Sequence, residues 1–540
     1  MGASSSSDGS SAQSLEQQEE ESLAVSTGSL HYLRASFSKL SSSDGTIPLS
    51  SLQEAFSINT SNFKSESELL QVPEKFPELL SHLGSCITSI FFKTATAGIT
   101  WVDFLRGFNR CCVKTPTSQS LTRLYQLFSA MCHEAGVGKK LDFDLGEDST
   151  GKVTGSFVPT QLVMFLWMCW VLMHSVLISR QVKVDKGILV LPDVTHLLNS
   201  ALVSSGLVGD DGDIWKVDFL ADDKEIPVQK LQGWVSSAVV GISHSLAQYV
   251  QQKIQLCAAS EESLGESVSA SDTAAGSHDT YLLTRGRAWA VSLSLRGALS
   301  NQLLNASFSG MDDDDLLYRA SVDGRGLSRF WSNVEGYNGP ILLLISAMVA
   351  NSSEADNRTT SNKWIIGILS EQGLESRDVY FGSSAYLFAI DPIFRAFPPS
   401  GKEKNFVYCH VQPAVRVYQA NPKPICVAFG GSLGNERILL DEDFARVVIR
   451  HHAVDKTYQH GPLFPNQGFL PTKAEILEVE VWGLGGESAK RQQDVYKKRE
   501  SIFSEQRRKV DLKTFGWEDS PEKMMMDMVS NPNRVRREER

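Results

Sequence analysis

The stretch "ICVAFGGSLGNERILLDEDF", Ile425 to Phe444, carries the pattern on which the fold and the chemistry of this chain depend. Its apolar run enters Gly-Gly-Ser-Leu-Gly, which fits the G-x-S-x-G nucleophile elbow with Ser432 as the nucleophile. The acids and histidines of a triad would follow in the required order as Asp441, Asp443, His451 and His452. The same glycines also suit a tight connection, because glycine adopts backbone conformations that other residues resist.

The surroundings of Ser432 favour the second interpretation. An elbow lies between a central strand and a long helix in a domain of alternating strands and helices. The residues before Ser432 instead form short β-type runs such as "ILLLIS", "KWIIGIL" and "FVYCHV", which predict a β-rich domain. If "RILL" is a further strand, the acidic residues Asp441, Glu442 and Asp443 lie at its end, as turn formers or as a charged docking edge.

Composition narrows the class of protein. The chain has 540 residues, 42% hydrophobic and 21% charged, which predicts several soluble domain-sized pieces. Its net charge of −11 argues against general nucleic-acid binding. The eight cysteines contain no C-x-x-C pair, so we expect reduced cytosolic thiols. His451, His452 and His460 lack partners at ligand spacing, and we predict no metal and no cofactor.

The N-terminal half has two predicted parts. Residues 1–28 are rich in serine with a short acidic run, which predicts disorder. Residues 29–257 place apolar residues at helical spacing around two loops, "LSSSDGTIPLSS" and "FKTATAGITWVD". Both loops keep the apolar eighth position of an EF-hand and lose most of its oxygen ligands. The sequence therefore predicts an all-helical, EF-hand-like region without calcium.

Two further segments bear on the domain organisation. Residues 162–178 carry no charge, but they reach only the lower edge of the ~20 residues that a spanning helix needs. We predict a buried helix, packed against a second apolar helix over Leu231–Ile254, and leave its contact with a membrane open. Residues 258–280 are rich in Ser, Ala and Glu and predict a linker.

The C-terminal segment, residues 487–540, is basic and helical in pattern. Its apolar residues recur as one narrow stripe, formed by Val495, Ile502, Phe503 and Val510. A stripe of this kind on a charged helix favours docking into the groove of a partner. A calmodulin-type target and a nuclear address are two other interpretations of the same segment.

Three blocks of the chain together resemble the TLDc domain family. They are "LLYRASVDGRGLSRFWSNVEGYNGPILLLI" (316–345), "FGGSLGNERILLDEDF" (429–444) and "EILEVEVWGLG" (475–485). The resemblance covers a domain that we place at residues 281–486, with Gly430 and Gly431 in its glycine run. It implies an α+β fold, with a β-sandwich of antiparallel sheets, flanking helices and no recognised catalytic constellation. The family's aromatic "FGLWLDEDL" is replaced here by "NERILLDEDF".

The layout as a whole is similar to that of the N-myristoylated, lysosome-associated and mTOR-linked TLDc proteins. "MGASSS" fits the signal for N-myristoylation of Gly2, and a single myristoyl chain binds membranes only marginally. The resemblance implies a non-enzymatic, cytoplasmic adaptor at endolysosomal or vacuolar membranes that binds the V-type proton ATPase and acts in oxidative-stress or growth signalling. A serine hydrolase or redox enzyme using Ser432 or a cysteine, and a nuclear stress-response factor, remain as alternatives.

Overall fold

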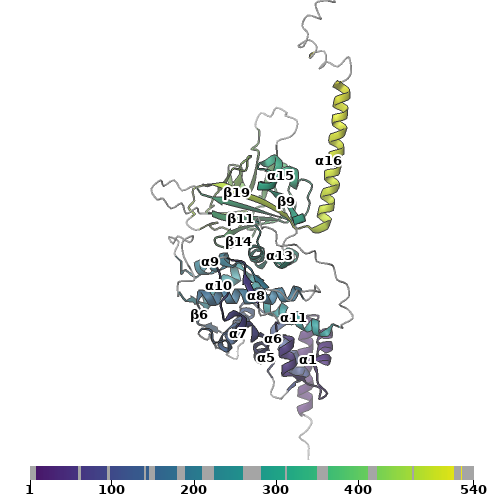
Figure 1. The fold of residues 1–540 in the computed structure, drawn as a ribbon, viewed down its shortest axis with the longest axis vertical. Helices are drawn as coiled ribbons and strands as arrows, with labels where there is room; N and C mark the ends of the chain where they lie inside the picture. Colours follow the sequence, from purple (N-terminus) through teal and green to yellow (C-terminus); the bar gives the residue numbers. More distant parts are fainter. Residues whose placement is uncertain are drawn as a thin grey trace, which may run out of the picture.

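The computed structural model places a helical half beside a curled sheet, from which a long helix projects (Figure 1). It describes residues 8–58, 62–67, 69–93, 98–138, 141–144, 152–178, 189–208, 224–259, 281–309, 313–349, 363–411, 422–464, 467–515 and 525. The helical and sheet-containing halves predicted from the sequence are both present.

The N-terminal half consists of α-helices and short two-stranded sheets. The helices are α1 (Asp8–Ser26), α2 (Leu30–Leu40), α3 (Leu49–Ala55), α4 (Phe76–Ser81), α5 (Leu83–Phe91), α6 (Trp101–Cys112), α7 (Thr117–Glu134), α8 (Pro159–Ile178), α9 (Thr195–Ser204), α10 (Val228–Ala238) and α11 (Ser245–Ala258). The small sheets pair β1 (Ile47–Pro48) with β3 (Gly98–Ile99), β2 (Phe63–Ser65) with β7 (Leu189–Leu191), β4 (Asp142–Asp144) with β5 (Lys152–Thr154), and β6 (Ser156–Phe157) with β8 (Ile226–Pro227). This half is therefore mainly, but not wholly, helical.

The first two helix–loop–helix units are joined through their loops. Ile47 and Ile99, which occupy the eighth position of each loop, are directly paired between β1 and β3 and are fully buried. In the first loop the Asp44 carboxylate forms hydrogen bonds within the loop, where it accepts from the Thr46 amide and hydroxyl. Among the described residues, no group of three metal-ligating side chains occurs.

A second pair of this kind follows in the chain, and the sequence analysis missed it. β6 and β8 pair through Phe157 and Ile226, and each strand leads into a helix, α8 or α10. The signal was a short recurrence, since "IPLSSLQ" at residues 47–53 returns as "IPVQKLQ" at residues 226–232. The single helix expected over Leu231–Ile254 is wrong, because a 3-10 turn at Val240–His244 separates α10 from α11.

The prediction of disorder for residues 1–28 is wrong for residues 8–26, which form helix α1. This helix packs along α6, where the Trp101 indole donates to the Glu21 carboxylate at 2.9 Å and Asn109 donates to the Glu20 carbonyl at 2.9 Å. Arg106 forms ion pairs with both Glu16 and Glu20. The acidic run is thus held by donors and cations on α6, which a composition argument cannot detect. Gly2 lies outside the described residues.

Helix α8 forms the centre of the helical half, as predicted for residues 162–178. Every residue from 162 to 173 is buried, and the Trp167 indole donates to the Pro192 carbonyl at 3.0 Å. Within the described residues one segment, Pro159–Val176, is long and apolar enough to cross a membrane, but 78% of it is buried inside the protein. That burial is typical of a core helix.

The C-terminal half is built on one antiparallel sheet. Its strands are β9 (Leu316–Arg319), β10 (Ile341–Met348), β11 (Lys363–Ser370), β12 (Arg377–Phe381), β13 (Ala385–Asp391), β14 (Arg395–Phe397), β15 (Val407–His410), β16 (Cys426–Ser432), β17 (Asn435–Leu440), β18 (Arg446–Ile449) and β19 (Thr472–Gly483). The order is β12-β15-β16-β17-β18-β19-β10-β11-β13-β14, with β9 also paired to β19. The two sheets of the expected sandwich are thus arms of one continuous sheet. It curls so that apolar residues from both arms, such as Leu343 on β10 and Phe429 on β16, share one core.

The outer face of β10, β11 and β13 packs against the helical half. Leu342, Leu344 and Phe388 belong to the same buried cluster as the residues of α8 and α9. Helices α12 (Arg285–Ser294) and α13 (Ala298–Ser309) contribute to the same cluster, and Figure 1 shows α13 between the sheet and the helical half. The predicted linker, residues 258–280, lies outside the described residues from 260 onward. The two halves, which the predicted linker separates in the sequence, therefore share one apolar core.

Candidate docking surface

Ser432 lies at the end of a hairpin strand. β16 and β17 pair with Ser432 opposite Asn435, so only Leu433 and Gly434 connect them. A nucleophile elbow needs a helix at this point, and a strand follows instead. Ser432 is exposed, and within the described part of the chain no hydrogen bond joins it to His451 or His452. The arrangement does not support the triad.

The two glycines before Ser432 have a structural role. Gly430 and Gly431 have φ values of +68° and +80°, in the region that favours glycine. A Cβ at Gly430 would lie 2.8 Å from the Tyr458 ring, and one at Gly431 would clash with the Asn435 carbonyl oxygen. The close approach of β16 to its neighbours therefore requires both glycines.

The acidic residues at the end of β17 divide into two groups. The Asp441 carboxylate accepts from the amides of Ala445 at 2.8 Å and Arg446 at 3.1 Å, so it stabilises the turn before β18. The side chains of Glu442 and Asp443 are exposed. The three acidic residues thus follow the end of β17, as predicted from the sequence. A docking role for the exposed Glu442 and Asp443 stays a prediction.

Thiol chemistry is disfavoured by burial. All eight cysteines lie in the described residues, and desolvation raises the pKa of each thiol, to about 11 for Cys86 and about 12 for Cys409 and Cys426. A reactive cysteine needs a lowered pKa, because the thiolate is the nucleophile. The sequence alternative of a redox enzyme using a cysteine therefore finds no support.

The base of helix α16 (Gly486–Phe515) is fastened to the sheet domain. Gln493, which is 6% exposed, donates to the carbonyls of Asn333 at 2.8 Å and Glu335 at 3.1 Å. The Tyr496 hydroxyl donates to the Glu335 carboxylate at 2.8 Å, and its ring covers Gly336 so closely that a Cβ there would clash with it. These contacts fix the direction in which α16 leaves the domain (Figure 1).

The predicted apolar stripe begins at the base of α16 with Val495 and continues to Ile502 and Phe503, beyond the anchoring residues. Val495, Ile502 and Phe503 are 51%, 47% and 58% exposed. Val510 lies within the helix, but its side chain is outside the described residues. Large apolar side chains left in water mark an interaction surface when they share one side of an element. We call Val495, Ile502 and Phe503 the α16 stripe.

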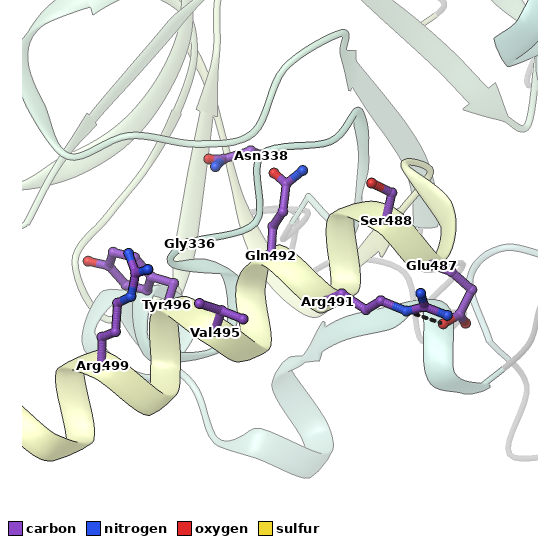
Figure 2. A pocket seen from close by; sticks show the side chains of 9 residues that line it. All are labelled: Gly336, Asn338, Glu487, Ser488, Arg491, Gln492, Val495, Tyr496 and Arg499. Atoms are coloured by element: carbon purple, nitrogen blue, oxygen red, sulfur yellow. Dashed lines mark ion pairs between the residues drawn. The ribbon is translucent and has the colours of Figure 1, made fainter.

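A pocket of about 730 Å³ lies where α16 leaves the domain (Figure 2). Val495 faces it, flanked one turn to either side by Arg491 and Arg499, as Figure 2 shows. Arg491 also approaches Glu487 at 4.0 Å. The pocket therefore presents an apolar floor between two guanidinium groups, and it continues the α16 stripe toward the sheet domain.

The residues that anchor α16 are not apparent from its apolar pattern. Ala489, Gln493 and Tyr496 are spaced one helical turn apart and face the sheet domain. Ala489 and Tyr496 are apolar or aromatic at a spacing of seven, so a second stripe was present in the sequence. It was overlooked because the larger aliphatic residues lie on the other side of the helix.

The structure thus defines an α+β domain with a curled antiparallel sheet and a docked C-terminal helix that exposes an apolar stripe. Residues 294–485 match the family model for the TLDc domain. The chain therefore contains a TLDc domain, and the resemblance noted in the sequence is confirmed for that region. A search of curated proteins finds no match to this chain. TLDc proteins are in general non-enzymatic regulators, and the geometry around Ser432 agrees with that class.

Proposed function

We propose that this chain is a non-enzymatic TLDc adaptor that acts at endolysosomal or vacuolar membranes. In this proposal the TLDc domain and α16 bind the V-type proton ATPase, and the complex serves oxidative-stress or mTOR-type growth signalling. N-myristoylation of Gly2 would provide reversible recruitment from the cytoplasm. The family resemblance supplies the partner, and the exposed α16 stripe supplies the surface.

The observation that carries the proposal is the contrast between the two sides of α16. Its anchoring side is fixed by Gln493 and Tyr496, whereas the α16 stripe has about half of each side chain in water. Complete burial of one such side chain contributes roughly 1.5–3 kcal/mol. A helix held at one end and apolar along its projecting part can therefore bind a groove with little further loss of conformational entropy.

Affinity capture tests the proposed partner. Wild-type protein and the double variant Ile502→Ser with Phe503→Ser are captured from cells, and the V-type ATPase subunits are quantified. We expect the variant to capture at least about tenfold less of the pump, since it lacks two apolar side chains that the complex would bury. Ser501→Gln with Ser504→Gln is the matched control, because it changes two exposed residues on the side of the same helix opposite to the stripe.

Three outcomes separate the alternatives. Retention of the pump by the double variant would contradict the role of the stripe. Recovery of calmodulin alone, in a calcium-dependent manner, would assign α16 to that partner instead. A nuclear protein whose localisation is unchanged by Gly2→Ala would remove the membrane part of the proposal. Ser432→Ala should leave capture unchanged, because the serine contributes to a hairpin end and not to the stripe.

A further inference from the structure

The helical half contains a second pocket, far from α16 in the chain. It has a volume of about 760 Å³ and is lined by residues of α5, α6 and α7 and of β4. Ile90, Phe91, Ala130 and Phe143 provide an apolar wall. The size is that of a site for a small ligand or a headgroup, since such pockets measure roughly 300–1,000 Å³.

Three cations surround this wall. Lys93, Arg110 and Arg123 line the pocket, and within the described part of the chain none of the three forms an ion pair. Glu134 is the carboxylate among the described lining residues, and it lies 3.5 Å from His133. This concentration of positive charge occurs in a chain whose net charge is −11. Charge complementarity therefore favours an anionic ligand.

Arg123 is the most buried of the three cations. Its side chain is partly buried, and its guanidinium meets the Thr115 hydroxyl at 3.4 Å. Burial lowers the pKa of this guanidinium, and the neighbouring thiols of Cys111 and Cys112 oppose that shift. A partly buried cation that lacks a carboxylate is costly, and a bound anion would offset part of that cost.

Helix α6 is common to the pocket and to the contact with the N-terminal helix. It contributes Arg110 to the pocket, and it holds α1 through Arg106, one turn earlier, and Asn109, the preceding residue. In the sequence no Lys, Arg or Cys precedes Arg34, so the segment around Gly2 has no second membrane signal of its own. Stable anchoring of a singly acylated protein requires such a second signal.

We propose that this pocket binds the headgroup of an acidic phospholipid and so supplies the second signal for membrane recruitment. The three cations would bind the phosphate and carboxylate oxygens, and the apolar wall would contact the glycerol and the first part of the acyl chains. We favour a headgroup over an acidic helical peptide, because the volume of the pocket is that of a small-ligand site and because its helix α6 also holds α1, which begins at Asp8. The proposal rests on the membrane location proposed above.

Vesicle binding of the full-length, non-acylated protein tests this site without depending on Gly2. Sedimentation is compared for vesicles of phosphatidylcholine alone and of phosphatidylcholine mixed with phosphatidylserine. We expect binding to the acidic vesicles that falls with added salt, and a loss of about 5-fold for each of Lys93→Gln and Arg110→Gln, since one cation near such a surface contributes about 1 kcal/mol. Both residues are exposed, so their replacement should leave the fold intact.

Lys230→Gln is the matched control, because Lys230 is an exposed cation on α10 outside the pocket. Equal losses for this control, or equal binding to the two kinds of vesicle, would overturn the proposal. Competition by inorganic phosphate as strong as that by soluble glycerophosphoserine would assign the site to a free anion and would also overturn it. Pump capture by Lys93→Gln and Arg110→Gln should remain normal in detergent, so a failure here is distinguishable from a failure of the α16 proposal.

Discussion

Single residues around Ser432 show how a catalytic motif can arise from backbone requirements. Gly430 and Gly431 adopt positive φ, and Gly434 lies in the two-residue connection that follows. These positions reproduce the spacing of a nucleophile elbow because a tight antiparallel turn also needs glycine near the end of its strand. The G-x-S-x-G spacing is present in the chain. The strand that follows Ser432, where an elbow has a helix, makes it the end of a hairpin.

Replacement of Gly431 tests this interpretation. Gly431→Ala should lower the free energy of unfolding by about 2 kcal/mol or more, because the residue has positive φ and the new Cβ would clash with the Asn435 carbonyl oxygen. Ser432→Ala, its neighbour, should change that free energy by less than about 0.5 kcal/mol, as surface substitutions usually do. Urea unfolding measures both. Equal effects of the two substitutions would contradict a structural role for the glycine.

His174 gives the stability of the helical half a defined pH dependence. Its ring stacks on Trp170 at 4.7 Å, and burial, with a further effect of Arg285, lowers its pKa from 6.5 to about 4. Between pH 6.5 and about 4 the unfolded chain binds a proton that the folded protein does not. The free energy of unfolding is therefore highest above pH 6.5. It decreases as the pH falls from 6.5 to about 4, by up to about 3 kcal/mol.

Urea midpoints measured from about pH 7 to about pH 4 check this dependence. His174→Phe keeps an aromatic ring against Trp170 and Phe308 and removes the titration, so its curve should be flatter over the same range. His133→Phe is the control, because His133 is exposed on α7. A wild-type curve as flat as that of His174→Phe would exclude the assignment.

At the scale of elements, α16 carries two functions on two sides. One side fixes the helix to the domain, and the other presents the α16 stripe. Heptad spacing in the sequence identified the stripe, because aliphatic residues dominate such a pattern. The anchoring side depends on an amide and a hydroxyl that hydrogen-bond to Asn333 and Glu335, at the C-terminal end of the helix Leu327–Val334. A pattern of apolar residues in the sequence does not reveal such hydrogen bonds.

Removal of one anchor should loosen the helix base without unfolding the domain. Gln493→Ala removes the Gln493 donor from the Glu335 carbonyl and leaves the Asn333 carbonyl with Lys497 as its donor at 3.1 Å, at a cost of about 1–3 kcal/mol. Amide hydrogen exchange over residues 486–499 should therefore accelerate, while exchange in β10 and β11 stays slow. Gln492→Ala is the control, since the adjacent Gln492 is exposed. Similar exchange in the two variants would show that the anchor contributes little.

For the whole molecule, the decisive feature is the contact between the two halves. Residues of α9 bind the segment that joins β13 and β14, where Asn199 donates to the Pro392 carbonyl at 2.9 Å and Ser200 donates to the Phe394 carbonyl at 2.6 Å. Ser200 also accepts from the Trp234 indole at 2.8 Å. These bonds lie beside the shared apolar cluster, so we expect the halves to unfold together.

Ser200→Ala tests that coupling. The substitution leaves a buried carbonyl and a buried indole N–H without their partner and should lower the free energy of unfolding by about 1–3 kcal/mol. Tryptophan fluorescence and far-ultraviolet circular dichroism should report a single transition at a reduced temperature. Ser204→Ala on the exposed side of α9 serves as the control. Two separate transitions in the wild-type protein would contradict a shared core.

Much of the fold follows from local patterns. The buried α8, the strands around "NERILL" and the loop residues Ile47 and Ile99 could be predicted, because apolar periodicity and turn residues act over short distances. The second paired loop could also have been found from the recurrence of "IPLSSLQ" as "IPVQKLQ". Helix α1 could not, since its acidic residues are held by α6, 80 residues or more away along the chain.

The sequence by itself determined the TLDc domain, the apolar stripe and the acylation motif, because each is written in residues close together in the chain. Only the tertiary structure decided that Ser432 ends a hairpin, that Asp441 stabilises a turn, and that the two halves share a core. It also brought Lys93, Arg110 and Arg123 around one pocket. Those outcomes depend on contacts between residues that are distant in sequence. Such contacts form, and contribute to stability, only when the chain has folded and excluded water from them.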